Sequence, residues 1–384
     1  MRRIVTRLVA AALICLGAAG LCAGCASDAD VVVGSMGEVA EGIVADAGNR
    51  YALTLGFAGD ICFSDDEDCS MQRLIQAGSD SITDGIDARF VELMNGMDLM
   101  WINNEFCYSD RGEPLEGKAY TFRSSPYNVH FLRDLGIDVA GLANNHVYDY
   151  GEDAFTDTLS TLEGAGIPYV GAGRNAAAAY APVYLEAEGL KIAYVAASRA
   201  EHYAVLTPEA TYGTPGIAWC YDDTLFLDAI REAAANADYV IALPHWGTEH
   251  SIELEEGQAE SGHAYIDAGA DAVIGAHPHI LQGIEYYNGK PILYSLGNFW
   301  FDWYDIDTLV AELRITGKRG EDGKASLEGA DVQLVLYPGT QSDAFTAWAD
   351  TDEWRSSIFR NLEDISYGIA IDGEGVVRPA EYAM

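Results

Sequence analysis

Short apolar runs alternate with amphipathic stretches along most of the chain from residue 51 onward. Each apolar run has the length of a strand and stops at polar or small residues, and most are followed by a segment with helical periodicity. This alternation predicts an α/β fold. The predicted strands are 51–58, 98–103, 139–142, 168–170, 191–197, 239–243, 272–274 and 291–295, and the clearest predicted helices are 86–97, 127–135, 154–165, 225–235 and 256–268.

The pattern changes beyond Trp300. Residues 308–316 and 331–337 alternate apolar and polar positions on either side of a Gly-, Lys- and Asp-rich turn, which predicts two antiparallel strands. We expect these strands to form the second sheet of the same domain. The predicted domain therefore covers residues 51–384, with a motif-bearing core at 51–301 and a β-rich part at 302–384.

The first 25 residues have the pattern of a secretion signal. Three arginines precede an apolar run, and the run ends in Leu-Cys-Ala-Gly-Cys, which resembles the end of a lipoprotein signal peptide. This predicts lipidation at Cys25 and a tether over residues 26–50. A membrane-spanning anchor and a secretion signal without lipid are the alternatives. Each of them places the remaining chain outside the cytoplasm, and lipidation places it at the membrane surface.

The charge balance narrows the range of partners. The chain has 60 acidic and 22 basic residues, a net charge of −38 at pH 7. A surface of this sign repels phosphate backbones, so we expect no nucleic-acid partner. The 49% apolar content is enough for a large buried core.

Four cysteines follow the leader: Cys62, Cys69, Cys107 and Cys220. An exported protein permits disulfides, and the predicted strand ends favour pairing Cys62 with Cys69 or Cys107. Free buried thiols are the other possibility, and the sequence leaves both open.

Residues with metal-binding and acid–base chemistry follow the predicted strands directly. Open α/β sheets place their sites at the carboxyl ends of strands, so we expect these side chains to converge. Convergence of so many suitable side chains by chance is improbable. The candidates are Asp60, Asn104, Glu105, Asn144, Asn145, His146, His245, Glu249, His277, His279 and Asn298.

The mixture of oxygen and nitrogen donors predicts one or two divalent ions such as Mn, Fe or Zn. Two adjacent ions need a bridging carboxylate, and Glu105 or Asp60 could supply it. Such ions would polarise a phosphoryl or carbonyl oxygen and supply a nucleophile near neutral pH. His146 is then the predicted general acid for the leaving group.

The ordered motifs resemble the CapA family of poly-γ-glutamate capsule proteins. Their order in the chain spans about residues 51–301. The motifs are Gly59-Asp60, Asn104-Glu105, Asn144-Asn145-His146-x-x-Asp149-x-Gly151, His245-Trp246-Gly247-x-Glu249, Gly275-Ala276-His277-Pro278-His279 and Ser295-Leu296-Gly297-Asn298-Phe299. That family in turn resembles the calcineurin-like metallophosphoesterases, which implies a four-layer α/β/β/α sandwich with mixed sheets.

The resemblance also implies roles for individual residues. His146 would be the catalytic acid, and Asn104 and Asn144 would support the site or touch substrate. Glu249 and Asn298 either orient His245 or bind substrate at the rim, or they cap or close the turns at strand ends. Asp149 is expected to cap the helix that starts near Glu152. The implied metal ligands are Asp60, Glu105 in the bridging position, Asn145, His245, His277 and His279.

One departure from the phosphoesterase pattern affects the metal site. Those enzymes have Asp-x-His in the first motif, whereas this chain has Cys62 at the third position. Glu105 also replaces the usual bridging Asp and adds one methylene. The implied consequence is that one ion is held weakly or is absent.

Three functions follow as hypotheses. The first is a surface-anchored protein that makes, exports, anchors or processes a γ-linked glutamate polymer, working with a polymer-synthase membrane complex. The second is a metal-dependent phosphoesterase for exported phosphoesters, and the third is a non-catalytic scaffold of a polymer-synthesis complex. Aromatic residues after the last motif, from Phe299 to Tyr304, either flank a polymer groove or pack in the core.

Overall fold

Two large β-sheets carry the fold in the computed structural model, which describes residues 49–200 and 206–380. The predicted signal peptide, its Cys25 and nearly all of the predicted tether lie outside these residues. Among the described helices, none combines the length and the hydropathy needed to cross a membrane.

The larger sheet has ten strands in the order β19-β20-β17-β16-β1-β2-β5-β6, with β15 beside β1 and β18 beside β17. Strands β15, β1, β2, β5 and β6 run parallel, and the other pairings are antiparallel. The bounds are β1 Arg50–Ile61, β2 Leu99–Asn104, β5 Val139–Gly141, β6 Tyr169–Val170, β15 Asn298–Trp300, β16 Ile306–Lys318, β17 Asp331–Ser342, β18 Phe345–Trp348, β19 Ile369–Ile371 and β20 Val376–Pro379.

The smaller sheet has six strands in the order β13-β14-β12-β11-β9-β8. Its four central strands are parallel, and an antiparallel strand closes each edge. Its bounds are β8 Val183–Ala187, β9 Leu190–Ser198, β11 Tyr239–His245, β12 Ala272–Ile274, β13 Ile284–Tyr287 and β14 Lys290–Leu293. Two short pairs complete the strands: β3 Cys107–Tyr108 with β4 Arg123–Ser124, and β7 Ala172–Gly173 with β10 Gly216–Ile217.

The five predicted helices lie close to their predicted positions, whereas α2, α6 and α9 were not predicted. The predicted segment 127–135 is divided into the 3₁₀ turn η2 and the short helix α4, with Pro126 in the first turn of η2. The bounds are α2 Met71–Ala77, η1 Ile82–Asp84, α3 Ala88–Gly96, η2 Pro126–Val129, α4 His130–Asp134, α5 Gly151–Ala165, α6 Ala176–Ala179, α7 Thr224–Asn236, α8 Gln258–Ala268 and α9 Asp352–Asp364.

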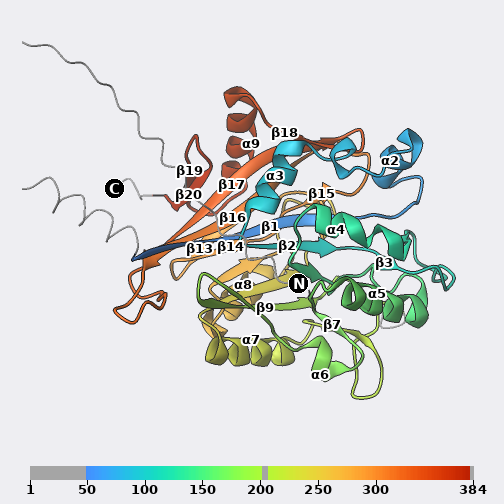
Figure 1. The fold of residues 1–384 in the computed structure, drawn as a ribbon, viewed down its shortest axis with the longest axis horizontal. Coiled ribbons are helices and arrows are strands. Elements are labelled where there is room, and N and C mark those ends of the chain that lie inside the picture. Colours follow the sequence, from blue (N-terminus) through green and yellow to red (C-terminus); the bar gives the residue numbers. More distant parts are fainter. Residues whose placement is uncertain (1–48, 201–205, 381–384) are drawn as a thin grey trace, which may run out of the picture. The chain divides into compact units, whose positions relative to one another are not determined.

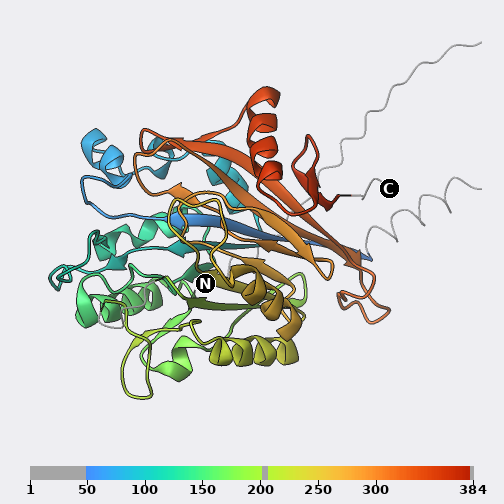
Figure 2. The same ribbon diagram turned by 180° about the vertical axis from the view of Figure 1, so that it is seen from behind.

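Three apolar cores separate four layers. The middle core packs the two sheets face to face, for example Phe57 of β1 with Tyr194 of β9. A second core joins the other face of the larger sheet to α3, α4 and α5, and a third joins the smaller sheet to α7 and α8. Figures 1 and 2 show α3 and α7 on opposite sides of the paired sheets. The predicted α/β/β/α sandwich with mixed sheets is confirmed.

Strand β1 shows how the sequence builds two of these cores. Leu53, Leu55 and Phe57 alternate onto the face between the sheets, whereas Ala58 and Ile61 belong to the core under the helices. All five side chains are completely buried. Each large side chain contributes roughly 1.5–3 kcal/mol of hydrophobic stabilisation, and the strand is therefore fixed in place up to its carboxyl end.

The prediction that the C-terminal strands form a second sheet is wrong. Strand β16 pairs with β1 from Arg50↔Lys318 to Ala58↔Val310, and β17 continues the same sheet. Figure 1 shows these two strands beside β1. An alternation of apolar and polar residues predicts an antiparallel strand, but it does not show which edge of which sheet the strand joins. The edge of β1 accepts β16 from Arg50 to Ala58, so the strands extend the first sheet.

Candidate metal centre

Strand ends of both sheets meet at one place. Strands β1, β2 and β5 are parallel neighbours, and so are β9, β11 and β12, so their carboxyl ends lie together. The loops after these ends contact one another across the layers. The backbone N of His277 donates to Asp60 Oδ2 at 3.3 Å, and His245 Nε2 lies 3.5 Å from Glu105 Oε1.

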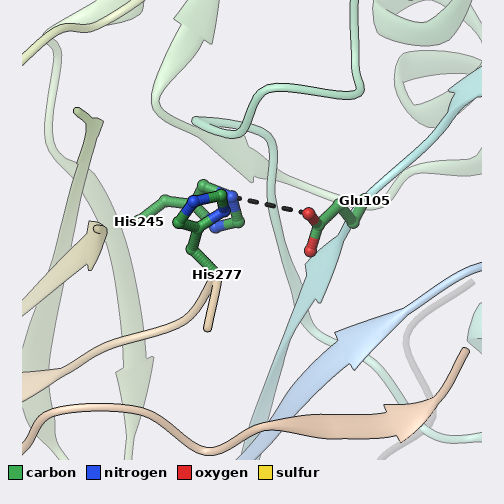
Figure 3. A group of neighbouring side chains, drawn as sticks. All are labelled: Glu105, His245 and His277. Atoms are coloured by element: carbon green, nitrogen blue, oxygen red, sulfur yellow. Dashed lines mark ion pairs between the residues drawn. The ribbon is translucent and has the colours of Figure 1, made fainter. Parts of the chain in front are cut away.

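Glu105 belongs to two groups of possible metal ligands. One group is Glu105 with His245 and His277, and the other is Glu105 with Asp60 and His279. Within each group the ligand atoms lie within 4.8 Å of one another, and all these residues are buried. Figure 3 shows Glu105, next to the end of β2, facing the imidazoles of His245 and His277. A carboxylate shared in this way has the position of a ligand that bridges two ions.

Asn145 adds an amide oxygen to the first group. Its Oδ1 lies 2.8 Å from His245 Nε2, and its backbone carbonyl accepts from Thr207 Oγ1 at 3.0 Å and from Lys118 Nζ. The group thus offers a carboxylate, an amide oxygen and two imidazoles. Four donors of these types suit Mn, Fe or Zn.

His146 lies beside these groups and is held by Asp149. The Nδ1 atom of His146 is 2.8 Å from Asp149 Oδ2, and Lys118 Nζ is 2.7 Å from Asp149 Oδ1. A carboxylate at Nδ1 fixes the ring and its tautomer. The Nε2 atom of His146 is therefore available for proton transfer.

The expected capping role of Asp149 is wrong. Helix α5 begins at Gly151, and Tyr150 at its N-cap makes no side-chain cap. Asp149 is fully buried and also accepts from the Phe122 backbone N at 2.7 Å. Charge-assisted bonds to His146 and Lys118 are stronger than a bond to a neutral helix amide, which accounts for this orientation.

Asn103 is a residue of the site that the sequence prediction missed. Its Nδ2 lies 2.7 Å from Asp60 Oδ1, 2.9 Å from Glu105 Oε2 and 3.3 Å from His245 Nδ1. The predicted Asn104 instead donates to the Phe106 carbonyl at 3.0 Å. Strand alternation was the available signal, because Asn103 and Glu105 are two apart and Asn104 points to the other face.

Asn144 shapes the turn that carries His146. Its Oδ1 accepts from the backbone N of His146 at 3.1 Å and of Val147 at 2.9 Å. Its Nδ2 donates to Asn103 Oδ1 at 3.1 Å and to the Asn104 carbonyl at 2.9 Å. The side chain therefore ties this turn to the end of β2.

Asn298 orients His279. Its Nδ2 donates to Asp302 Oδ2 at 3.0 Å, which directs its Oδ1 to His279 Nδ1 at 2.8 Å. The Nδ1 atom of His279 then carries the proton, and its Nε2 faces Glu105 Oε1 at 3.9 Å. Outer hydrogen bonds of this type fix the orientation of metal-binding imidazoles.

Burial keeps two of the imidazoles neutral. It lowers the pKa of His277 to about 3, with a further contribution from the charge of His279. Burial followed by the charge of His277 holds the pKa of His245 well below its usual value. Neutral imidazoles are the form that binds a metal.

The pKa values of the two buried carboxylates are shifted in opposite directions. Burial, followed by the negative charge of Asp60, raises the pKa of Glu105 well above its ordinary value. Burial also acts to raise the pKa of Asp60, but the hydrogen bond and charge of His279 outweigh it and the pKa is lowered. A cation between these acids would favour ionisation of both.

The loop from His277 to His279 has unusual backbone angles. His277 has φ +102° and His279 has φ +61°, values that L-residues rarely adopt. Each costs roughly 1–3 kcal/mol. The backbone N of Asn298 donates to the His279 carbonyl at 3.2 Å, which holds the loop in place. Strain retained in this way is typical of functional sites.

The residues present fit a divalent metal. Within the described residues, the buried atoms Glu105 Oε1 and His277 Nδ1 have no hydrogen-bond partner. Unpaired buried donors and acceptors are costly, and a coordinated ion would satisfy both. When bound, such ions polarise a phosphoryl or carbonyl oxygen and supply a nucleophile near neutral pH.

Cys62 does not replace the missing histidine. Its Sγ faces Cys69 Sγ at 3.7 Å, and it belongs to neither group that shares Glu105. Burial raises the pKa of this thiol well above its ordinary value, so it stays protonated. In the part of the chain that the structure describes, the four cysteines are free buried thiols and neither considered disulfide is formed.

A cavity of about 420 Å³ opens beside the centre. His146, Glu249 and His279 line its inner part, and Trp303 and Tyr304 are among the aromatic residues of its wall. The earlier aromatic residues Phe299 and Trp300 are fully buried and belong to the core under the helices. The first part of the aromatic segment therefore packs in the core, and the later part lines the cavity.

Comparison with known proteins identifies related sequences. The family model described as bacterial capsule synthesis protein PGA_cap matches residues 54–303. The PGA biosynthesis protein CapA of Bacillus subtilis (strain 168) is 36% identical over 186 residues, 48% of each chain. A probable polyglutamine synthesis accessory protein of Mycobacterium tuberculosis (strain H37Rv) is 34% identical over 231 residues, 57% of this chain and 60% of that protein.

These alignments span 48% and 60% of the length of the two curated relatives. Among solved structures, a phosphatase from Mycoplasma pneumoniae matches with a TM-score of 0.45 at 12% identity, over 82% of this chain and 99% of that one. The family model covers most of the described domain, including every predicted metal ligand. The chain therefore belongs to the PGA_cap family of bacterial capsule synthesis proteins, as the motifs had predicted.

Proposed function

We propose that this protein is a metal-dependent hydrolase of poly-γ-glutamate capsule synthesis, export or processing, anchored at the outer cell surface. The observation that carries the proposal is the carboxylate of Glu105, which is shared by two groups of buried ligands. The family and its similarity to the PGA biosynthesis protein CapA of Bacillus subtilis support the capsule role.

In this proposal, Asp60, Glu105 and His279 would hold one divalent ion, and Glu105, Asn145, His245 and His277 would hold the other. His146 would take up a proton at Nε2 from the attacking water and pass it to the leaving amine of the substrate. Asp149 keeps the His146 ring in the required orientation through their 2.8 Å contact. The cavity beside His146 would accommodate the segment of polymer next to the cleaved bond.

The proposed location rests on the N-terminal sequence. A lipid on Cys25 would hold the domain at the outer face of the cell membrane, next to a polymer-synthase membrane complex. The chain carries 60 acidic residues against 22 basic ones, which disfavours a polyanionic polymer at the general surface. Two bound cations would offset this charge at the centre, so the polymer would be attracted there and repelled elsewhere.

A phosphoesterase is the second candidate. The pairing of His146 with Asp149 beside a shared carboxylate equally suits protonation of an alkoxide leaving group. In that case the substrate would be an exported phosphoester, and the lining of the cavity would bind its organic part.

Parallel assays of the purified full-length chain with Mn²⁺ distinguish these functions. The substrates are a γ-linked glutamate oligomer, followed by release of new amino groups, and a chromogenic phosphodiester. The proposal predicts cleavage of the oligomer that is lost in His146→Ala and in Asp60→Ala. A His130→Ala variant, which changes an imidazole on α4, is the matched control.

Cleavage of the phosphodiester alone, dependent on His146, would favour the second candidate. Cells that make normal amounts of polymer with an Asp60→Ala, His277→Ala chain would point to a non-catalytic scaffold and would overturn both enzymatic functions.

A further inference from the structure

Glu249 lies at the centre but has no place in the two groups that share Glu105. A carboxylate oxygen of Glu249 and ligand nitrogens of His277 and His279 lie within 4.8 Å of one another. Two ligands of one ion, each about 2.0–2.3 Å from it, are at most roughly 4.6 Å apart. Only a small adjustment therefore separates this arrangement from shared coordination.

The loop that carries Glu249 is fixed to the histidine loop on both sides of the residue. The backbone N of Trp246 donates to the Ala276 carbonyl at 3.0 Å, and the backbone N of His250 donates to the Pro278 carbonyl at 2.8 Å. Gly247 makes the turn between these points with φ +87°. These bonds hold the two loops side by side and keep the Glu249 carboxylate close to His277 and His279.

The numbers of donors show where a further ligand is needed. The ion between Glu105, His245 and His277 also has Asn145 within reach, which gives four protein donors. The ion between Asp60, Glu105 and His279 has three. Its usual fourth donor, an imidazole two residues after the aspartate, is Cys62 here, and that thiol faces Cys69.

Two further observations point to a ligand at this place. Glu105 Oε1, which belongs to a fully buried side chain and lies 3.9 Å from His279 Nε2, has no hydrogen-bond partner within the described residues. Glu249 itself is exposed, so its carboxylate can reach the cavity without a cost of burial. A carboxylate on the solvent side would complete the coordination and leave the remaining positions to water or substrate.

We infer that Glu249 is a protein ligand of the ion held by Asp60, Glu105 and His279, in place of the imidazole that Cys62 does not supply. This inference rests on the proposed two-metal centre. It assigns the carboxylate to the metal and not to the substrate.

Mn²⁺ binding to the purified full-length chain, followed by calorimetry and by electron paramagnetic resonance, tests the inference. The unchanged chain should bind two ions and give the spectrum of a coupled pair. Glu249→Gln should lower the affinity for one ion about 10-fold or more and leave the affinity for the other unchanged. It should also remove the spectrum of the coupled pair. Glu253→Gln changes an exposed carboxylate of the same loop and should leave both ions unchanged.

A combined variant identifies the ion concerned. If Glu249 and Asp60 hold the same ion, then Asp60→Ala and the Asp60→Ala, Glu249→Gln chain should both bind one ion with equal affinity. Two ions at unchanged affinity in Glu249→Gln would overturn the inference and leave the centre intact, and so would loss of the remaining ion in the combined variant. No bound ion in the unchanged chain would instead overturn the proposed function.

Discussion

Two buried glutamates of the larger sheet differ in their partners. Glu312 in β16 is 2% exposed, and Arg314 donates to both of its oxygens at 2.9 Å while the Tyr337 hydroxyl donates at 2.6 Å. Glu105 after β2 is fully buried, lies near Asp60, and has one oxygen without a hydrogen-bond partner among the described residues. Equal burial thus accompanies opposite electrostatic environments.

Topology accounts for the difference. Glu312 is in the middle of an antiparallel strand, where its partners come from the same strand and from the neighbouring β17. Glu105 follows a parallel strand, where the ends of β1, β5 and β11 also deliver polar groups. Both oxygens of the first glutamate are paired by the protein, whereas one oxygen of the second has no hydrogen-bond partner among the described residues. Burial alone therefore does not distinguish a structural carboxylate from a ligand.

The largest expected effect is on metal binding by Glu105→Gln. Loss of the shared carboxylate should lower Mn²⁺ affinity by about 100-fold or more, roughly 2.7 kcal/mol. Stability without metal should stay equal or rise, because a neutral amide replaces a carboxyl whose pKa burial has raised. Calorimetric titration and urea unfolding measure the two effects. A large loss of stability with unchanged affinity would remove the distinction between the two glutamates.

Glu312→Gln should give the opposite result. Arg314 would lose its charged partner, and we expect the free energy of unfolding to fall by about 2 kcal/mol, reduced because the Arg314 side chain is 39% exposed. Mn²⁺ affinity should not change. The same two measurements apply, and a clear effect on metal binding would contradict a purely structural role.

Asn298→Ala should produce a smaller loss at the centre. His279 would lose the acceptor at its Nδ1, which lies 2.8 Å away, and the affinity for one Mn²⁺ should fall about 10-fold. The control in the same titration is Asn361→Ala, which also removes a side-chain amide, in this case from helix α9. Equal effects of the two changes would exclude orientation of His279 as the cause.

The smallest expected effect, and the one that depends most on pH, is the contribution of Asp138 to the free energy of unfolding. Burial raises its pKa to about 6, and its Oδ2 accepts from the Met100 backbone N at 2.9 Å. The folded state therefore binds the proton more tightly than the unfolded chain, whose Asp pKa is about 3.9. Protonation of Asp138 therefore stabilises the folded state below about pH 4, and this stabilisation is lost as the pH rises through 6.

Asp138→Asn keeps the acceptor for Met100 and removes the charge. It should raise the free energy of unfolding by about 1 kcal/mol at pH 7 and have little effect at pH 4, as judged by urea unfolding at both values. A benefit that is the same at both pH values would show that the carboxyl does not titrate as its burial implies.

The sequence predicted the fold class and the convergence of ligands for one physical reason. Apolar runs that end in polar residues mark the carboxyl ends of strands, and parallel strands bring those ends together. This was enough to gather Asp60, Glu105, His245, His277 and His279 in advance. Strand alternation could also have favoured Asn103 over Asn104, because Asn103 lies two residues before Glu105 and shares its face of the strand.

The remaining errors concern contacts between distant segments. The edge that β16 joins depends on which side of β1 is free, and local alternation does not contain that information. The side chain of Asp149 turns to Lys118 and His146 because a loop brings Lys118 against it, which helix-capping rules do not foresee. The closeness of Cys62 and Cys69 likewise depends on how the single loop between β1 and α2 folds.

Anomalous X-ray diffraction from crystals of the Mn²⁺-loaded chain tests the central claim most directly. We expect two manganese peaks on either side of the Glu105 carboxylate, one next to Asp60 and His279 and the other next to His245 and His277. Crystals with no peak at Glu105, or with manganese only at surface carboxylates elsewhere, would contradict the account.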